Sequence, residues 1–274
     1  MKSGEWPERD YEEVGCFRCG LQGRLLYRKG LFGVAQCPRC GQVFTSPRLK
    51  EGSIAEIYAD ASYFDEGVYG FSKKFSLALL LQKAWWNGRV NLVKSMSKGD
   101  IQGRKMLEIG CAYGLFLEYA RQRGFEVTGV EYSSTGVEWI RKHLKIEVYQ
   151  GEIEKMQLPE RNYDVICFWD VIEHVANPVH FLRAVRKLIK EDGIIAFSCP
   201  YFTSIPARMF RSRWWTLRPE QHLSHFTPRT LQRAFADAKL ELMGVVKNPL
   251  ALANLGRFDS LIGIARRNMS YANT

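Results

Sequence analysis

The stretch LEIGCAYG at positions 107–114 limits the possible folds more than any other part of this sequence. Its apolar start reads as a buried strand, and two closely spaced glycines follow before another apolar run. Gly110 permits a sharp turn and removes side chains from the path of a ligand, and Gly114 lets the next helix start close by. Because ligands of doubly wound sheets bind at the carboxyl ends of strands, the stretch predicts an α/β fold with a binding site here.

The sequence around this stretch alternates between strand patterns and helix patterns. We expect strands near 105–109, 126–131, 145–149, 163–169, 193–199, 240–247 and 260–266. We expect helices near 53–60, 71–98, 114–123, 134–143, 178–190 and 228–238. Alternation of this length indicates a mostly parallel sheet with right-handed crossovers.

Two acidic residues limit which class of nucleoside ligand can bind here. Glu108 stands two residues before Gly110, where it would repel the pyrophosphate of a dinucleotide, and the GxxxG spacing differs from the dinucleotide fingerprint. Glu131 ends the second strand, where an acid accepts hydrogen bonds from ribose hydroxyls. A nucleoside that carries a cation and no pyrophosphate fits both acids, and S-adenosylmethionine is such a ligand.

These motifs resemble those of the class I S-adenosylmethionine-dependent methyltransferases, strongly over 104–200 and more loosely to 267. LEIGCAYG is similar to the family's first motif, with Ala112 in place of the middle glycine. YDVICFWDVIEHV resembles the subfamily that includes ubiquinone-pathway methyltransferases. The resemblance implies a doubly wound, mostly parallel seven-stranded Rossmann-like sheet.

The resemblance also implies a set of cofactor-binding residues. Glu131 would hold the ribose, Glu152 the adenine amine, and Trp169 and Asp170 the methionine side. The full set is Glu108, Gly110, Cys111, Ala112, Gly114, Glu131, Tyr132, Glu152, Trp169 and Asp170.

Four cysteines form two CxxC pairs near the N-terminus, and a glycine follows each pair. They are Cys16, Cys19, Cys37 and Cys40. Two such turns supply the four sulfurs of a tetrahedral zinc shell, and the spacing is typical of a zinc ribbon. Such a closed shell is structural. The alternatives are two disulfides or a redox pair, which would not explain the duplication.

The ribbon and the large domain together are similar to a bacterial group of zinc-ribbon methyltransferases, as CPRCGQVFTSPR and EQHLSHFTPRTL indicate. That group is associated with polysaccharide, sugar and natural-product pathways. The resemblance implies O- or C-methylation of a sugar, glycolipid or other small hydroxylated metabolite. We expect a zinc ribbon over 1–50, a helical linker or lid over 51–102 and the methyltransferase domain over 103–267.

An acceptor cap is expected at 201–228, after the fifth central strand. Its arginines suit a phosphate or carboxylate, and the alternative is a packing loop with solvated arginines. Histidine accepts a proton near neutral pH. The candidate bases are therefore His174, His222 and His225.

Charge and composition leave other functions open. The net charge of +10 would attract phosphates, nucleic acids or anionic membranes, or reflect only a solvated basic surface. An RNA base methyltransferase is the first alternative, but the sequence has no N/D-P-P-Y/F motif and no compact basic stripe outside the cap. An inactive zinc-ribbon adaptor is the second.

No apolar run behind a basic start is present, so we expect a soluble, cytoplasmic protein. The oligomeric state stays open.

Overall fold

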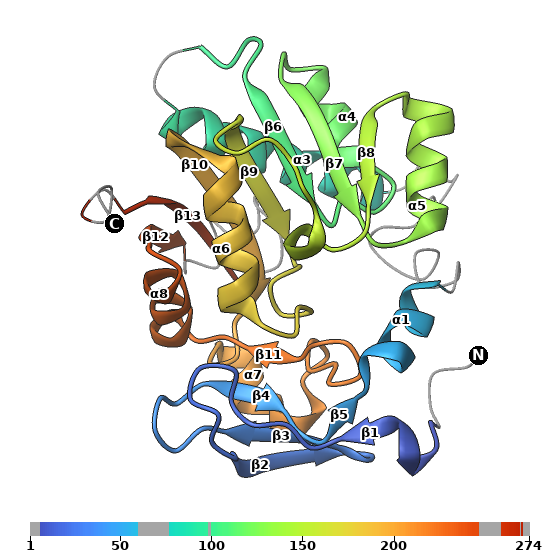
Figure 1. The fold of residues 1–274 in the computed structure, drawn as a ribbon, viewed down its shortest axis with the longest axis vertical. Helices are drawn as coiled ribbons and strands as arrows, with labels where there is room; N and C mark the ends of the chain where they lie inside the picture. The colour runs from blue at the N-terminus through green and yellow to red at the C-terminus, as the bar shows by residue number, and fades with distance from the viewer. Residues whose placement is uncertain (1–5, 60–76, 98–99, 247–258, 269, 271–274) are drawn as a thin grey trace.

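A seven-stranded sheet forms the centre of the structure, a computed structural model that describes residues 6–59, 77–97, 100–246, 259–268 and 270 (Figure 1). The strand order is β12-β13-β10-β9-β6-β7-β8, and β13 runs antiparallel to both of its neighbours. The strands are β6 (Lys105–Ile109), β7 (Glu126–Glu131), β8 (Glu147–Gln150), β9 (Tyr163–Trp169), β10 (Ile189–Pro200), β12 (Leu240–Val246) and β13 (Ser260–Arg267). The predicted doubly wound, mostly parallel sheet is confirmed.

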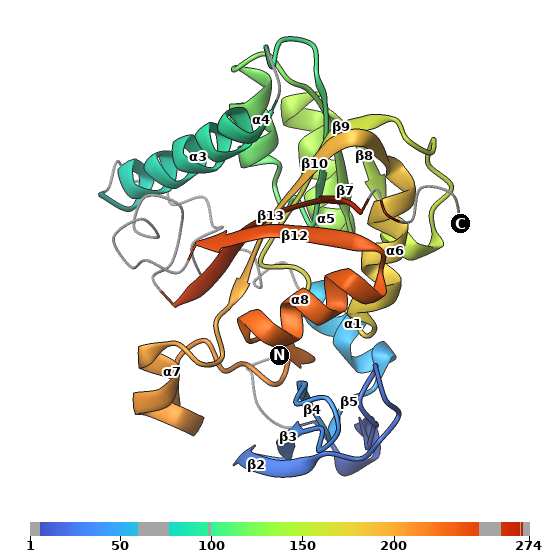
Figure 2. The same ribbon diagram turned by 90° about the vertical axis from the view of Figure 1, so that its left-hand side faces the viewer.

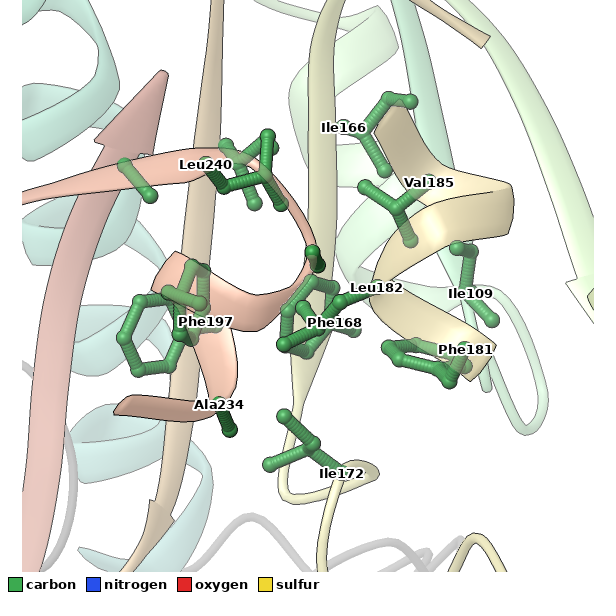
Figure 3. Packing of buried hydrophobic residues seen from close by; sticks show 14 of the residues in the cluster. Ile109, Ile166, Phe168, Ile172, Phe181, Leu182, Val185, Phe197, Ala234 and Leu240 are labelled. Atoms are coloured by element: carbon green, nitrogen blue, oxygen red, sulfur yellow. The ribbon is translucent and has the colours of Figure 1, made fainter. Parts of the chain in front are cut away.

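Helices cover both faces of this sheet (Figure 2). The helices on one face are α6 (Pro178–Leu188) and α8 (Pro228–Asp237), and those on the other are α3 (Leu77–Met96) and α4 (Leu115–Arg121). Figure 3 shows the first side, where Phe181 meets Phe168 edge-on with ring centroids 5.0 Å apart. Since both faces are covered, β9 reads as the nearly continuous apolar run YDVICFW rather than as an alternating pattern.

Helix α5 (Ser134–Trp139) continues into a π-helical turn over Ile140–Leu144 and packs beside α4 and β8. A short helix, α1 (Glu51–Ala59), follows the N-terminal segment, and η3 (Ile153–Lys155) follows β8. The lid expected within 51–102 falls partly on 60–76 and 98–99, which lie outside the described residues. None of the helices that the structure describes is long and apolar enough to cross a membrane.

The cysteine segment builds a second, smaller sheet below the large one in Figure 1. Its strands are β2 (Arg24–Lys29), β3 (Phe32–Gln36), β4 (Val43–Thr45) and β11 (Ser224–His225), and β1 (Tyr11–Glu12) pairs separately with β5 (Arg48–Leu49). The strand β11 comes from the cap and pairs antiparallel with β4, with Ser224 opposite Phe44. A segment from far along the chain, between β10 and α8, thus completes the sheet of the N-terminal ribbon.

The cap and the ribbon also share one hydrophobic cluster. The cap contains α7 (Ile205–Phe210) and the 3-10 turn η4 (Arg211–Arg213). The buried members of the cluster are Val34 and Val43 from the ribbon and Ala207, Trp214 and Leu217 from the cap. The ribbon is therefore packed against the segment that follows β10, rather than connected to it only through the linker.

Candidate functional site

The glycine stretch forms a tight loop between β6 and α4. Gly110, Ala112 and Gly114 all have positive φ, at 71°, 49° and 67°. The Gly110 amide donates to the Val130 carbonyl at 2.8 Å, and the Gly114 amide donates to the Cys111 carbonyl at 2.7 Å. The loop backbone is thereby held at the carboxyl ends of β6 and β7, where a ligand can approach it closely.

The carboxylate of Glu131 fastens this loop to the end of β7. Its Oε2 accepts a hydrogen bond from the Ala112 amide at 2.7 Å, and its Oε1 accepts one from the Ser133 amide at 2.9 Å. Burial raises the pKa of Glu131, and the amide hydrogen bonds from Ser133 and Ala112 oppose that shift. The structure thus places Glu131 directly beside the glycine loop, and its role as a ribose ligand stays a prediction.

Glu108 lies on β6 and is buried near the side chain of Arg89, which the sequence did not predict to be part of the site. Burial raises its pKa well above the usual range, while the nearby Arg89 of α3 lowers it. The Arg89 guanidinium carbon lies 4.5 Å from the centre of the Trp169 ring, a cation–π contact. Arg89 stands inside the long helix α3, where no local motif marks it.

Two polar atoms of this group are buried and accept or donate no hydrogen bond within the described part of the chain. They are Oε2 of Glu108 and Nε1 of Trp169. A buried polar atom without a hydrogen bond is costly in a folded protein, unless a ligand or water meets it. The carboxylate oxygen can accept a hydrogen bond from an ammonium group. These two atoms therefore fit the charged end of S-adenosylmethionine.

The carboxyl end of β9 contributes Asp170 in a strained backbone conformation. Its φ is 55°, and its amide donates to the Ser198 carbonyl at 3.0 Å. The Ser198 hydroxyl donates to Asp170 Oδ1 at 3.0 Å. A non-glycine residue with positive φ is uncommon and concentrates at functional sites. The neighbouring β10 therefore fixes the orientation of this predicted cofactor residue.

The other predicted cofactor residues lie around this centre in different settings. Tyr132 is exposed, and the Glu152 carboxylate forms an ion pair with Lys155 at 2.9 Å. Cys111 is buried, and burial raises the pKa of its thiol well above the usual range. A protonated buried thiol is inert, so we assign Cys111 to packing behind the loop.

The three candidate bases are split between two places. His174 and His222 stand with their rings 4.7 Å apart and nearly perpendicular. With buried Glu173 they form a set whose ligand atoms lie within 4.8 Å of one another, a donor set that could hold a divalent cation. Burial lowers the pKa of His174 to about 4, which keeps its ring neutral at pH 7.

His225 lies in β11, within the small sheet. Its Nε2 is 3.2 Å from the Thr45 hydroxyl, and the residue is buried between ribbon and cap. Burial lowers the pKa of His225 to about 3. Because His225 lies between Thr45 and the cap, we infer that it joins the ribbon to the cap, and His174 and His222 stay the candidates for proton transfer.

The pKa of His225 makes stability depend on pH. The unfolded chain binds a proton at about pH 6.5, whereas the folded chain does so only at about 3, so stability falls as pH falls between these values. The free energy of unfolding of the wild-type protein should therefore fall between pH 6.5 and 5, and His225→Asn should make this fall smaller by about 2 kcal/mol. Urea unfolding at both pH values measures this. His180→Gln, at an exposed histidine, is the control, and an equal change in both variants contradicts the assignment.

The four ribbon cysteines converge as the spacing predicts. Their sulfur atoms lie within 4.8 Å of one another, and Cys16 Sγ is 3.6 Å from Cys40 Sγ. Burial raises the pKa of Cys37, but hydrogen bonds from the amides of Cys40 and Arg39 and from the thiols of Cys40 and Cys16 together outweigh it and bring the value down to about 7. All four are free thiols, and a four-sulfur cluster of this size fits a structural zinc ion.

Gly110 gives a sharp test of the loop. A Cβ there would lie 2.5 Å from Val171 Cγ2, and the φ is unfavourable for other residues. Gly110→Ala should cost about 2–4 kcal/mol of unfolding free energy, from strain and overpacking together. Gly103→Ala is the matched control, because its φ is +72° but no atom lies within 4 Å of its Cβ. Equal losses in urea unfolding would show that the contact with Val171 is unimportant.

The strand order, the glycine loop and the strand-end carboxylates define a class: the Rossmann-like methyltransferases. Residues 89–244 match the model of a family described as a methyltransferase domain, and the chain belongs to that family. The predicted family is therefore confirmed.

Curated relatives and solved structures agree with this assignment. A mitochondrial ubiquinone biosynthesis O-methyltransferase of Arabidopsis thaliana is 31% identical over 171 residues, 56% of this chain and 53% of the relative. One from Alkalilimnicola ehrlichii is 32% identical over 106 residues, 36% and 43% of the two chains. The chain spans about half the length of the curated relatives it matches.

Two solved structures show the same fold. The magnesium protoporphyrin IX methyltransferase of Synechocystis PCC 6803, solved with bound SAH, has a TM-score of 0.59 at 15% identity, over 80% of this chain and all of the other. An S-adenosylmethionine-dependent methyltransferase from Mesorhizobium loti has a TM-score of 0.53 at 17% identity, over 66% and 98%.

Proposed function

We propose that this protein transfers the methyl group of S-adenosylmethionine to a small hydroxylated acceptor. The observation that carries the proposal is the hydrogen bond from the Ala112 amide to Glu131 Oε2, which joins the glycine loop to the acid expected to bind the ribose. The relatives named as ubiquinone biosynthesis O-methyltransferases favour oxygen as the methylated atom. A sugar or glycolipid acceptor remains the specific proposal from the sequence.

Most residues of the proposed site would bind the cofactor rather than the acceptor. Bound S-adenosylmethionine supplies an electrophilic methyl group on a sulfonium. Glu131 would hold the ribose hydroxyls, and Glu108 would accept from the ammonium. Trp169 would form an apolar wall beside the methionine part. Catalysis by such a site depends on positioning, because the cofactor already carries the reactive group.

Proton removal from an acceptor hydroxyl falls to the pair His174 and His222. Their side chains contact each other, and His222 comes from the cap, which follows β10. The ring of His174 is unprotonated at pH 7, as a general base must be, but its lowered pKa of about 4 makes it a weaker base than an ordinary histidine. The cluster of Cys16, Cys19, Cys37 and Cys40 would hold zinc as a structural ion, away from the transferred group.

The experiment uses S-adenosylmethionine with a labelled methyl group and fractions of host extract: RNA, lipid, polysaccharide and small metabolites. Label should enter a fraction other than RNA with the wild-type protein and not with Glu131→Ala. Label that enters RNA would replace the proposal with RNA methylation. A protein that does not bind the cofactor would indicate an adaptor.

A further inference from the structure

The cap presents an apolar surface to solvent. Ile205 and Met209 are each 71% exposed, Phe210 is 47% exposed and Trp215 is 44% exposed. The rings of Phe210 and Trp215 lie 5.4 Å apart, so they form one patch. Figure 2 shows α7 at the outside of the molecule, away from the large sheet. We name Ile205, Met209, Phe210 and Trp215 the cap patch.

This patch is held in place by the buried side of the same segment. The Trp214 indole Nε1 donates to Asp259 Oδ2 at 2.9 Å, and the Thr216 hydroxyl donates to the same oxygen at 2.8 Å. Trp214 and Asp259 are both buried. Trp214 is thus fixed between Asp259, just before β13, and the ribbon, while the neighbouring Trp215 is exposed. The helix α7, which carries the other three exposed side chains, is anchored by Ala207, which is buried in the same cluster as Trp214.

The segment that carries the cap patch has charges of one sign. Residues 205–218 contain four arginines and no acidic residue. The arginines are Arg208, Arg211, Arg213 and Arg218, and all are exposed. From the adjoining strand β2, the Lys29 ammonium donates to the Leu217 carbonyl at 2.7 Å. The combination of large apolar side chains with the arginines of the same segment favours a partner that is both apolar and anionic.

We propose that the cap patch docks the protein on an anionic phospholipid bilayer. Ile205, Met209 and Phe210 enter the boundary between headgroups and acyl chains, and the arginines pair with lipid phosphates. Affinity of this kind grows with buried apolar area and with attraction to anionic lipids. Single-stranded RNA fits the patch less well, because bases could stack on Phe210 and Trp215 but the two most exposed side chains, Ile205 and Met209, have no ring.

Sedimentation with vesicles tests the proposal independently of methyl transfer. The full-length protein is mixed with vesicles of phosphatidylcholine alone, or of phosphatidylcholine with phosphatidylglycerol. Binding should require the anionic lipid and weaken as salt is raised. The double variant Arg208→Glu with Arg213→Glu should weaken binding to anionic vesicles by about 20-fold or more.

Control substitutions outside the cap patch show whether a loss of vesicle binding is specific to the patch. Ile205→Ser with Met209→Ser should weaken binding by about tenfold or more, since it removes the inserted apolar groups. Met243→Ser, at a methionine of β12 that is 42% exposed, and Lys142→Glu, at an exposed lysine distant in sequence, should leave binding unchanged. All these positions are on the surface, and circular dichroism verifies that each variant is folded.

Three results would overturn the proposal. The first is equal binding to the two kinds of vesicle, or none to either. The second is loss of binding in the Met243→Ser or Lys142→Glu control to the same degree as in the patch variants. The third is RNA binding that depends on the arginines while vesicles are ignored, which would assign the surface to nucleic acid.

Discussion

Glu131→Ala is expected to weaken S-adenosylmethionine binding by about 10- to 100-fold. The carboxylate already accepts from the amides of Ala112 and Ser133, so its position is fixed before the cofactor arrives. Hydrogen bonds to a charged group contribute about 1.5–3 kcal/mol each, and the variant loses those to the ribose. Isothermal titration calorimetry with the cofactor measures the effect.

The same carboxylate holds the loop, so stability must be measured beside affinity. Loss of the acceptor for the Ala112 amide should lower the free energy of unfolding by about 1–3 kcal/mol without ligand. Glu126→Ala is the matched control, because Glu126 starts the same strand β7 and is exposed. An unchanged dissociation constant in Glu131→Ala would remove Glu131 from the site.

Cys37→Ser should cost the protein its zinc and unfold the ribbon. Structural zinc supplies about 10–16 kcal/mol of apparent binding free energy in small zinc domains, and three of the ribbon cysteines belong to one of its buried clusters. The metal content by mass spectrometry and the protease resistance of residues 1–50 are the measurements. Cys199→Ala, at a buried cysteine of β10 outside the cluster, should keep the metal.

The effect should spread from the ribbon to the cap but not to the cofactor loop. Without β4, the cap strand β11 loses its partner, and Trp214 loses the packing of Val34 and Val43. Turnover of the acceptor should therefore fall, while cofactor affinity is retained, because the glycine loop and Glu131 belong to the large sheet. A metal-free protein whose ribbon resists protease as before would contradict the zinc assignment.

The sequence predicted the large sheet well because its signals are local. Apolar runs such as YDVICFW mark buried strands, and β6, β7 and β9 have the bounds expected for them. The convergence of the four cysteines follows from two CxxC turns. The juxtaposition of Glu131 with the glycine loop follows from the parallel order of β6 and β7.

Other features depend on contacts between distant segments, and no short pattern predicts them. A strand of two residues such as β11 has no periodicity, so its pairing with β4 could not be expected. For the same reason His225 was a candidate base, although it lies against Thr45. Arg89 lies at the site because α3 packs against the end of β9, beside Trp169, and the sequence does not show this contact.

The pairing of β11 with β4 sets an order for folding during synthesis. The ribosome makes the ribbon first, but the edge of β4 has no strand beside it until Ser224 and His225 have left the exit tunnel. An open strand edge can pair with other chains, and contacts of long sequence separation form slowly. Nascent chains that end before residue 224 should therefore aggregate more readily and recruit chaperones more than chains that end after α8.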